Sequence, residues 1–240
     1  GLYCDGIFDY IELYVVPDNL EKISHWKKLN IPFDIHAPHS AHGMNLANCQ
    51  YEKANMLLYS DVKKYADELG ARYVVFHGGV DGDCNEVARQ LFLINDSRAL
   101  IENKPYKPLK FVTANKYIGV LPSEIELIRQ KVSCGFCLDI GHAICAANSY
   151  KNNPYDFITQ FVKLAPQKIH LSDMKILSED DMHLNFGFGD VNFNKLFSEI
   201  LPKDIDITIE TAKNSNMDLN DFIADVNFLR KIIRGALCQT

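Results

Sequence analysis

The chain has 240 residues, of which 47% are hydrophobic and 23% are charged, and its formal net charge is −6. This length is sufficient for one sizeable hydrophobic core, so residues 1–240 are expected to form a single α/β barrel domain. The negative charge does not favour a protein that holds nucleic acid mainly through a basic face.

The seven cysteines, of which Cys238 is the last, are an odd number in a chain of this size, so a disulfide framework is not expected. Cys134 and Cys137 form a single CxxC pair, but Cys137 falls within a predicted buried strand, which disfavours a redox role. The sequence has no apolar run of about 20 residues and no signal-peptide pattern. We therefore expect a reduced, cytoplasmic enzyme without a membrane partner.

Seven short apolar runs, most of which end in a histidine or a carboxylate, predict β-strands. In chain order they are residues 10–16, 31–38, 72–79, 99–105, the first half of 135–143, 168–173 and 205–211. Continuous apolar runs of this length are typical of strands that are buried on both faces of a parallel sheet. A closed barrel of such strands has eight, so the first strand is expected to be missing from this chain.

Helical periodicity predicts helices in the intervals between the strands and after the last one. They cover residues 18–29, 52–69, 85–95, a segment that opens at residue 122, 153–164, 193–201 and 219–233, while residues 2–8 read as the tail of another helix. Asp18 is expected to cap the first helix, Gly70 to end the second, and Ser123 with Glu126 to form a capping box. The alternation of strand and helix predicts a parallel (β/α)8, TIM-barrel-like fold with the helices outside.

Side chains that commonly bind metals stand at the ends of six consecutive predicted strands. They are His36, His77, Glu102, Asp139, His170 and Glu210. Successive positions are about 25 to 40 residues apart, which is the βα period of a parallel barrel whose strand ends converge on one mouth. His142 follows shortly after the fifth strand, and Asp181 and His183 lie in the loop beyond the sixth. A single histidine or carboxylate at a strand end is most often an ordinary core or surface residue. Six consecutive strands that all end in such a residue favour a functional site.

Four carboxylates close together would repel one another and take up protons unless a cation neutralised them. Histidine and carboxylate side chains together suit zinc, manganese, cobalt or iron. Nine such ligands are sufficient for two or three ions, an arrangement suited to in-line phosphoester chemistry. His39, Asn103 and Lys104, which follow ligand positions in the sequence, are expected to bind the substrate.

The motifs that carry these residues, in this order, resemble those of endonuclease IV, the second family of apurinic endonucleases, within the xylose isomerase-like TIM barrels. The resemblance covers residues 10–211 and rests on seven motifs: IHAP with His36, VVFHGG with His77, IENKP with Glu102, LDIGHA with Asp139 and His142, IHLSD with His170, DMHLNFGFG with Asp181 and His183, and TIET with Glu210.

The resemblance implies a hydrolase with three zinc ions. His36, His77 and Glu102 would hold the first ion. Asp139, His170 and Glu210 would hold a second, and Glu102 would bridge these two. His142, Asp181 and His183 would hold the third. Water activated by the ions would attack phosphorus in a phosphoester, and Glu102 and Glu210 are the expected catalytic residues.

Related barrels are sugar or sugar-phosphate isomerases and epimerases that use a single divalent ion. Mn2+, Mg2+ or Co2+ would then be held by Glu102, Asp139, His170 and Glu210, and the two glutamates would act as acid and base beside a carbonyl. The family holds DNA with basic and apolar side chains from its early loops, whereas the loop after the first predicted strand here reads PDNLE, which has no basic residue. His39 stands where the family often has an aromatic. A small phosphorylated or sugar substrate is therefore expected, with abasic DNA as the alternative that the resemblance implies.

Overall fold

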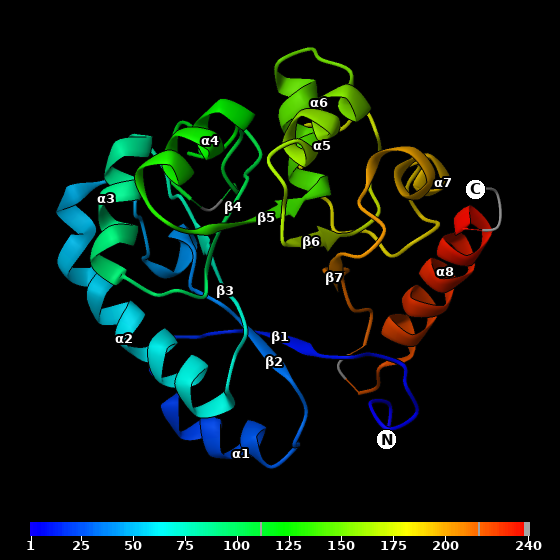
Figure 1. The fold of residues 1–240 in the computed structure, drawn as a ribbon, viewed down its shortest axis with the longest axis horizontal. Coiled ribbons are helices and arrows are strands. Elements are labelled where there is room, and N and C mark those ends of the chain that lie inside the picture. Colours follow the sequence, from blue (N-terminus) through cyan, green and yellow to red (C-terminus); the bar gives the residue numbers. More distant parts are fainter. Residues whose placement is uncertain (111, 216, 238–240) are drawn as a thin grey trace. The chain divides into compact units, whose positions relative to one another are not determined.

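The computed structural model describes residues 1–110, 112–215 and 217–237, so Cys238 lies outside the described residues. The chain forms two compact units, unit 1 over Gly1–Cys137 and unit 2 from Leu138 onward. Figure 1 labels the strands and helices of each unit.

Seven strands are present in the described residues, and the pairings between neighbours are parallel. They are β1 (Ile11–Tyr14), β2 (Phe33–His36), β3 (Val74–His77), β4 (Ala99–Glu102), β5 (Gly135–Asp139), β6 (Lys168–Leu171) and β7 (Asp206–Ile209), and their order follows the chain. Each strand lies within one of the seven predicted runs. The parallel strands in chain order confirm the predicted fold class.

Strand burial and register determine where the polar strand ends lie. β2, β3, β4 and β6 are buried along their whole length, as expected for strands that are covered on both faces, whereas β1 and β7 are half-buried. In unit 1, Tyr14 is paired with His36, and His77 is paired with Glu102. Parallel pairing therefore places these side chains at the same edge of the unit 1 strands.

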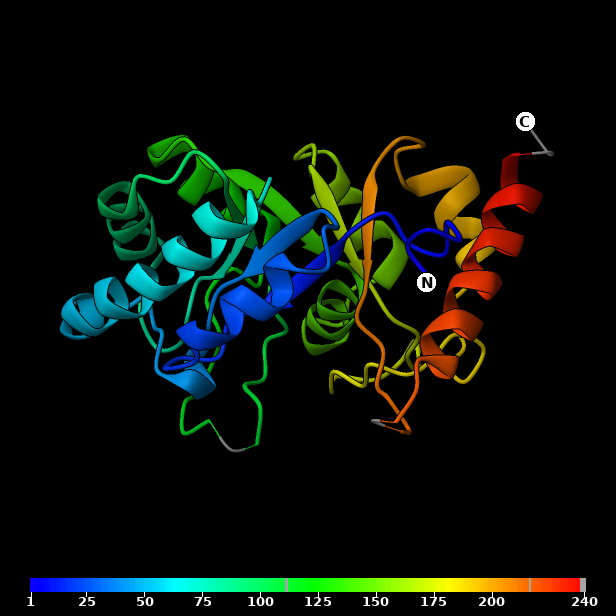
Figure 2. The same ribbon diagram turned by 90° about the horizontal axis from the view of Figure 1, so that it is seen from below.

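Helices follow the strands in both units. In unit 1 they are η1 (Leu20–Lys22), α1 (Ile23–Lys27), η2 (Ser40–His42), η3 (Cys49–Tyr51), α2 (Glu52–Leu69), α3 (Cys84–Ile94) and α4 (Pro122–Lys131). In unit 2 they are α5 (Ile140–Ser149), α6 (Pro154–Val162), α7 (Phe193–Lys195), the π-helix η4 (Leu196–Ile200) and α8 (Asn220–Leu237). Figure 2 shows α1, α2 and α3 along one side of the unit 1 strands. Gly70 ends α2 with a φ of 64°, as predicted, because glycine adopts this left-handed conformation without strain.

Two predictions near the amino terminus are wrong. Asp18 does not cap a helix, because it adopts a φ of 60° and Asn19 occupies the position before η1. Residues 2–8 form hydrogen-bonded turns, in which the N–H of Ile7 donates to the carbonyl of Leu2, and they do not continue a helix.

The predicted capping box of Ser123 and Glu126 is also wrong. The helix α4 begins at Pro122, which places Glu124 at its third position. The Glu124 carboxylate accepts hydrogen bonds from the N–H groups that precede the helix, including that of Leu121 at 3.2 Å. Because a capping side chain must reach back over the first turn, the first residue of the helix decides which of the two glutamates can do so.

The sequence does not predict α5, which follows β5 directly. Residues 140–147 are all buried, so this helix has no polar face and no amphipathic pattern. Asp139 caps the helix, since its Oδ1 accepts the N–H of His142 at 2.7 Å. His142 is therefore a helical residue, held one turn away from the strand end.

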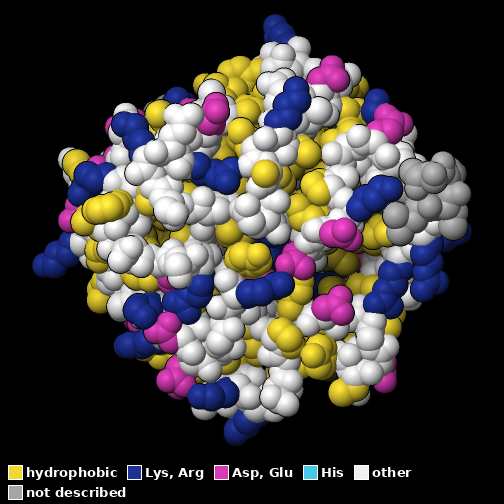
Figure 3. Space-filling view, viewed as in Figure 1, with side chains coloured by type: hydrophobic (Ala, Val, Ile, Leu, Met, Phe, Trp, Pro, Cys, Tyr) yellow, Lys and Arg dark blue, Asp and Glu magenta, His cyan; other side chains and the backbone are white. Residues whose placement is uncertain are grey.

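Among the described residues, none of the helices combines the length and the apolar character that crossing a bilayer requires. On the face shown in Figure 3, acidic and basic side chains are interspersed.

Candidate functional site

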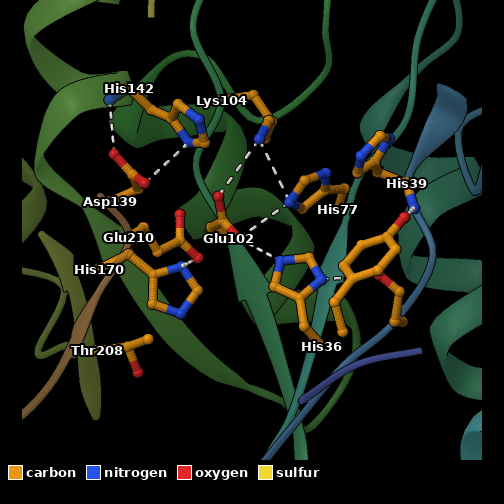
Figure 4. Close-up of polar contacts among 12 residues, drawn as sticks. His36, His39, His77, Glu102, Lys104, Asp139, His142, His170, Thr208 and Glu210 are labelled. Carbon is orange, nitrogen blue, oxygen red and sulfur yellow. Dashed lines mark hydrogen bonds and ion pairs between the residues drawn. The ribbon is translucent and has the colours of Figure 1, made fainter. Parts of the chain in front are cut away.

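In unit 1, the ends of β2, β3 and β4 bring His36, His77 and Glu102 together, as Figure 4 shows. The Oε2 atom of Glu102 lies 3.2 Å from His36 Nε2 and 3.0 Å from His77 Nε2. All three side chains are buried, and that of Glu102 is only 1% exposed. The predicted ligands of unit 1 therefore converge on one carboxylate oxygen.

The hydrogen bond of His36 decides what this cluster can bind. His36 Nδ1 lies 2.7 Å from the carbonyl oxygen of Ala37, which can only accept, so Nδ1 carries the proton. In the neutral ring the Nε2 lone pair then faces a carboxylate oxygen, and two acceptors at this distance repel unless a cation lies between them. In a tetrahedral zinc site, neighbouring ligand atoms are about 3.3 Å apart. The donor set and its spacing therefore fit a divalent metal ion.

Lys104 is part of the same cluster. Its Nζ lies 3.3 Å from His77 Nε2 and 3.4 Å from Glu102 Oε1, and 5.6 Å from the centre of the Tyr117 ring. Burial holds the pKa of His77 well below its usual value, and the positive charge of Lys104 lowers it further. A neutral imidazole at this position can serve as a metal ligand through Nε2. Asn103, the other residue of this turn that was expected to bind substrate, is fully buried.

His39 lies beside this cluster and stacks on His77, with ring centroids 5.7 Å apart and an interplanar angle of 12°. Burial lowers its pKa to about 4, with a contribution from the charge of Lys104. The N–H of Ala41 donates to His39 Nδ1 at 3.2 Å, so the proton of the neutral ring is on Nε2. His39 therefore presents an N–H donor, the chemistry expected of a residue that binds a substrate oxygen.

Tyr14 and Glu12, both in β1, belong to this neighbourhood, but the sequence does not predict them. Tyr14 Oη accepts the N–H of His39 at 3.1 Å and forms a hydrogen bond of 2.6 Å with His42 Nδ1. The carboxylate of Glu12 lies within 4.8 Å of a ring nitrogen of His36. The position of Tyr14 in the sequence could have indicated it, because β1 pairs with β2 and the last residue of β1, Tyr14, lies opposite His36.

In unit 2, His142, Asp181 and His183 form a second cluster of the same composition. Asp181 Oδ2 lies 3.1 Å from His142 Nε2 and 2.7 Å from His183 Nε2. His183 Nδ1 lies 2.7 Å from the carbonyl oxygen of Glu210, so in the neutral ring a lone pair again faces a carboxylate. This cluster has the donor chemistry for a metal ion as well.

In this second cluster, burial and the neighbouring charges shift the pKa values in opposite directions. Burial raises the pKa of Asp181, but the charges and hydrogen bonds of His142 and His183 outweigh burial, and the pKa lies well below its usual value. Burial lowers the pKa of His183, but Asp181 outweighs that effect and raises it to about 9. Without a metal ion, the Asp181 carboxylate therefore stays charged and is paired with a protonated His183.

The loop that carries Asp181 and His183 is fixed by Asp173, which follows β6. The Oδ2 atom of Asp173 accepts the N–H groups of Gly187 and Gly189, each at 2.9 Å. A Cβ added at Gly189 would lie 2.1 Å from Asp173 Oδ1, so this close approach requires glycine. The loop is thus anchored on both sides of the two ligands.

Three further predicted residues of unit 2 lie at or next to strand ends. His170 Nδ1 forms an ion-pair contact of 2.9 Å with Glu210 Oε1. Next to this pair, and outside the predicted set, Lys168 Nζ lies 3.3 Å from Thr208 Oγ1. Asp139 Oδ2 lies 3.6 Å from His142 Nδ1. The ion that the resemblance assigns to Glu102 together with Asp139, His170 and Glu210 draws on both units and stays a prediction.

Comparison with known proteins supports the predicted resemblance. Residues 8–232 match the family model of the xylose isomerase-like TIM barrel. The chain is 26% identical over 190 residues to probable endonuclease 4 of Mycoplasmoides gallisepticum, covering 71% of this chain and 60% of the length of that relative. The chain therefore spans about three fifths of the length of that relative.

Two solved structures share the fold. A D-tagatose 3-epimerase-like protein matches with a TM-score of 0.73 and 21% identity, covering 97% of this chain and 91% of the other. Endonuclease IV from Thermus thermophilus matches with a TM-score of 0.69 and 18% identity, covering 99% and 93%. The chain, with its parallel strands and intervening helices, belongs to the xylose isomerase-like TIM-barrel family.

Proposed function

We propose that the protein is a divalent-metal-dependent enzyme that hydrolyses a phosphoester at a multinuclear zinc site. The observation that carries the proposal is the presence of two separate clusters, each with two imidazoles sharing one carboxylate oxygen. Two clusters of this kind suit more than one ion, and multinuclear sites are typical of phosphoester hydrolysis. When bound, the ions would supply Lewis-acid polarisation of the phosphoryl group and lower the pKa of water.

The side chains around the unit 1 cluster fit an anionic substrate. His39 offers an N–H donor and Lys104 offers an ammonium, and both lie against His77. These two groups would bind and orient phosphate oxygens, while Tyr14 holds the backbone of His39 in place. Glu102 would provide the carboxylate oxygen that lies next to both His36 and His77. Glu210 would orient His170 through their 2.9 Å contact. This combination of donors suits a small phosphorylated substrate, with abasic DNA as the larger alternative.

A sugar isomerase or epimerase is the second candidate, and the contact between His170 and Glu210 favours it. The Glu210 side chain is 24% exposed, whereas that of His170 is fully buried, so Glu210 can exchange protons with a substrate. In this candidate Glu102 and Glu210 act as acid and base, with one Mn2+, Mg2+ or Co2+ ion. The fold likeness to a D-tagatose 3-epimerase-like protein is consistent with it.

Paired assays distinguish the two candidates. Purified protein, with zinc or with manganese added, is incubated with a small phosphodiester, with duplex DNA that contains an abasic site, and with a set of keto-sugars. Phosphoester cleavage that Glu102→Gln abolishes would support the hydrolase. Conversion of a keto-sugar that Glu210→Gln abolishes, without phosphoester cleavage, would replace the hydrolase by the isomerase.

A further inference from the structure

We propose that the ammonium of Lys104 is the resident cation of the unit 1 cluster, and that a divalent ion enters this cluster only by displacing it. The inference rests on the proposed metal site and assigns a role in metal binding to a residue that is not itself a ligand.

Lys104 contacts the same side chains that a metal ion would need as ligands. Its side chain is 6% exposed, and Nζ lies 3.3 Å from His77 Nε2 and 3.4 Å from Glu102 Oε1, as Figure 4 shows. An ammonium can only donate, and the Oε1 atom of Glu102 beside it can accept. In the metal-free protein, Lys104 therefore supplies positive charge to a carboxylate that is almost entirely buried.

The ammonium and a divalent ion are too close to coexist without strong repulsion. A zinc ion bound to His77 would lie about 2.1 Å from its Nε2 atom. Since Lys104 Nζ lies 3.3 Å from the same atom, the ion and the ammonium would be at most about 5.4 Å apart. Even with the screening of bulk water, a dication and a monocation at that separation repel enough to weaken binding about tenfold.

The unit 2 cluster has a different partner chemistry. The ion pairs of Asp181 are with His142 and His183, and both imidazoles can become ligands of an incoming ion. An ammonium has no lone pair and cannot serve as a ligand, so it has to move away from His77 and Glu102 when the ion binds. We therefore expect the unit 2 cluster to fill at lower metal concentration than the unit 1 cluster.

The test follows zinc binding to unit 1 in an Asp181→Asn background, which removes the negative charge of the carboxylate shared in unit 2. The zinc dissociation constant is measured by competition with a chromophoric chelator. Lys104→Met is expected to lower this constant at least about tenfold, because it removes the charge and keeps an unbranched chain. Lys104→Arg keeps the charge and is expected not to lower it. Lys63→Met, which removes an exposed lysine paired with Asp67, serves as the control and is expected to change nothing.

A dissociation constant for Lys104→Met within twofold of the background would overturn the inference while leaving the metal site intact. Absence of zinc binding in both proteins would overturn the metal site and the inference together.

Thermal unfolding provides a second readout. Without metal, Lys104→Met is expected to unfold at a lower temperature than the background, because Glu102 loses positive charge next to it. Saturating zinc is expected to raise the unfolding midpoint of the variant more than that of the background. Equal midpoints without metal, together with equal shifts on adding zinc, would contradict the inference.

Discussion

Replacing Glu102 by glutamine is expected to remove metal and activity together. Oε2 of Glu102 is the oxygen shared by His36 and His77, and the amide keeps the shape of the side chain while it removes the charge. Changing a residue that only supports a metal ligand typically lowers metal affinity about 10- to 100-fold. Loss of a shared ligand is therefore expected to lower affinity more than about 100-fold.

The same substitution also leaves the buried Lys104 ammonium without its carboxylate at 3.4 Å. At an effective dielectric constant of about 20, that pair is worth about 5 kcal/mol. Breaking a buried pair costs about 3–5 kcal/mol, and the lower end applies here because a lysine side chain can move toward solvent. The metal-free variant is expected to lose about 3 kcal/mol of unfolding free energy, or about 6–12 °C in its thermal midpoint.

The assay for Glu102→Gln combines elemental analysis, circular dichroism below the thermal midpoint and the phosphoester and keto-sugar assays. Glu126→Gln makes the same chemical change at an exposed position of α4 and is the control, with metal content and activity unchanged. A folded Glu102→Gln protein that keeps both its metal and its activity would refute the assignment of this residue.

Two further predictions concern the supports of the fold. Gly189→Ala would push a methyl group to within 2.1 Å of Asp173 Oδ1. It is expected to lower the free energy of unfolding in urea by about 1–3 kcal/mol and to weaken metal binding in unit 2. Gly235→Ala is the control: its added methyl meets nothing within 4 Å, so it is expected to be neutral or slightly stabilising. Burial raises the pKa of Asp96, but its hydrogen bonds with Arg98 outweigh burial and lower the pKa below 3.8. This carboxylate therefore stabilises the fold above that pH, and the contribution disappears as the pH falls through the folded-state pKa. Asp96→Asn is expected to lose about 1–3 kcal/mol at neutral pH and to flatten the acid limb of a urea-unfolding series, and an unchanged acid limb would contradict the assignment.

The positions of the strand-end ligands could be predicted because parallel strands determine them. His36, His77 and Glu102 end three successive buried strands, and parallel pairing brings such ends to one edge. The short apolar runs indicate where the strands lie, and the parallel arrangement of the strands then places their last residues at the same edge of the sheet. For the same reason His170 and Glu210 could be expected near each other in unit 2, where they lie in contact.

Other features depend on backbone conformation that periodicity does not encode. The hydrogen bond between Tyr14 and His42 requires the turn at η2 to return His42 to β1. The helix α5 is buried along almost its whole length, so it lacks the amphipathic pattern by which a surface helix is found. The anchoring of the ligand loop by Asp173 depends on the backbone approaching at Gly189. None of these leaves a regular spacing in the sequence.

The most direct test of the proposed metal chemistry is the metal content per chain, measured by elemental analysis of protein purified without added metal or chelator. The proposal of a multinuclear zinc site predicts two or three zinc ions per chain, falling in the Glu102→Gln and Asp181→Asn variants. One manganese, magnesium or cobalt ion per chain would contradict the hydrolase and favour the isomerase. No metal after dialysis against zinc, in protein that is folded by circular dichroism, would contradict the metal centre itself.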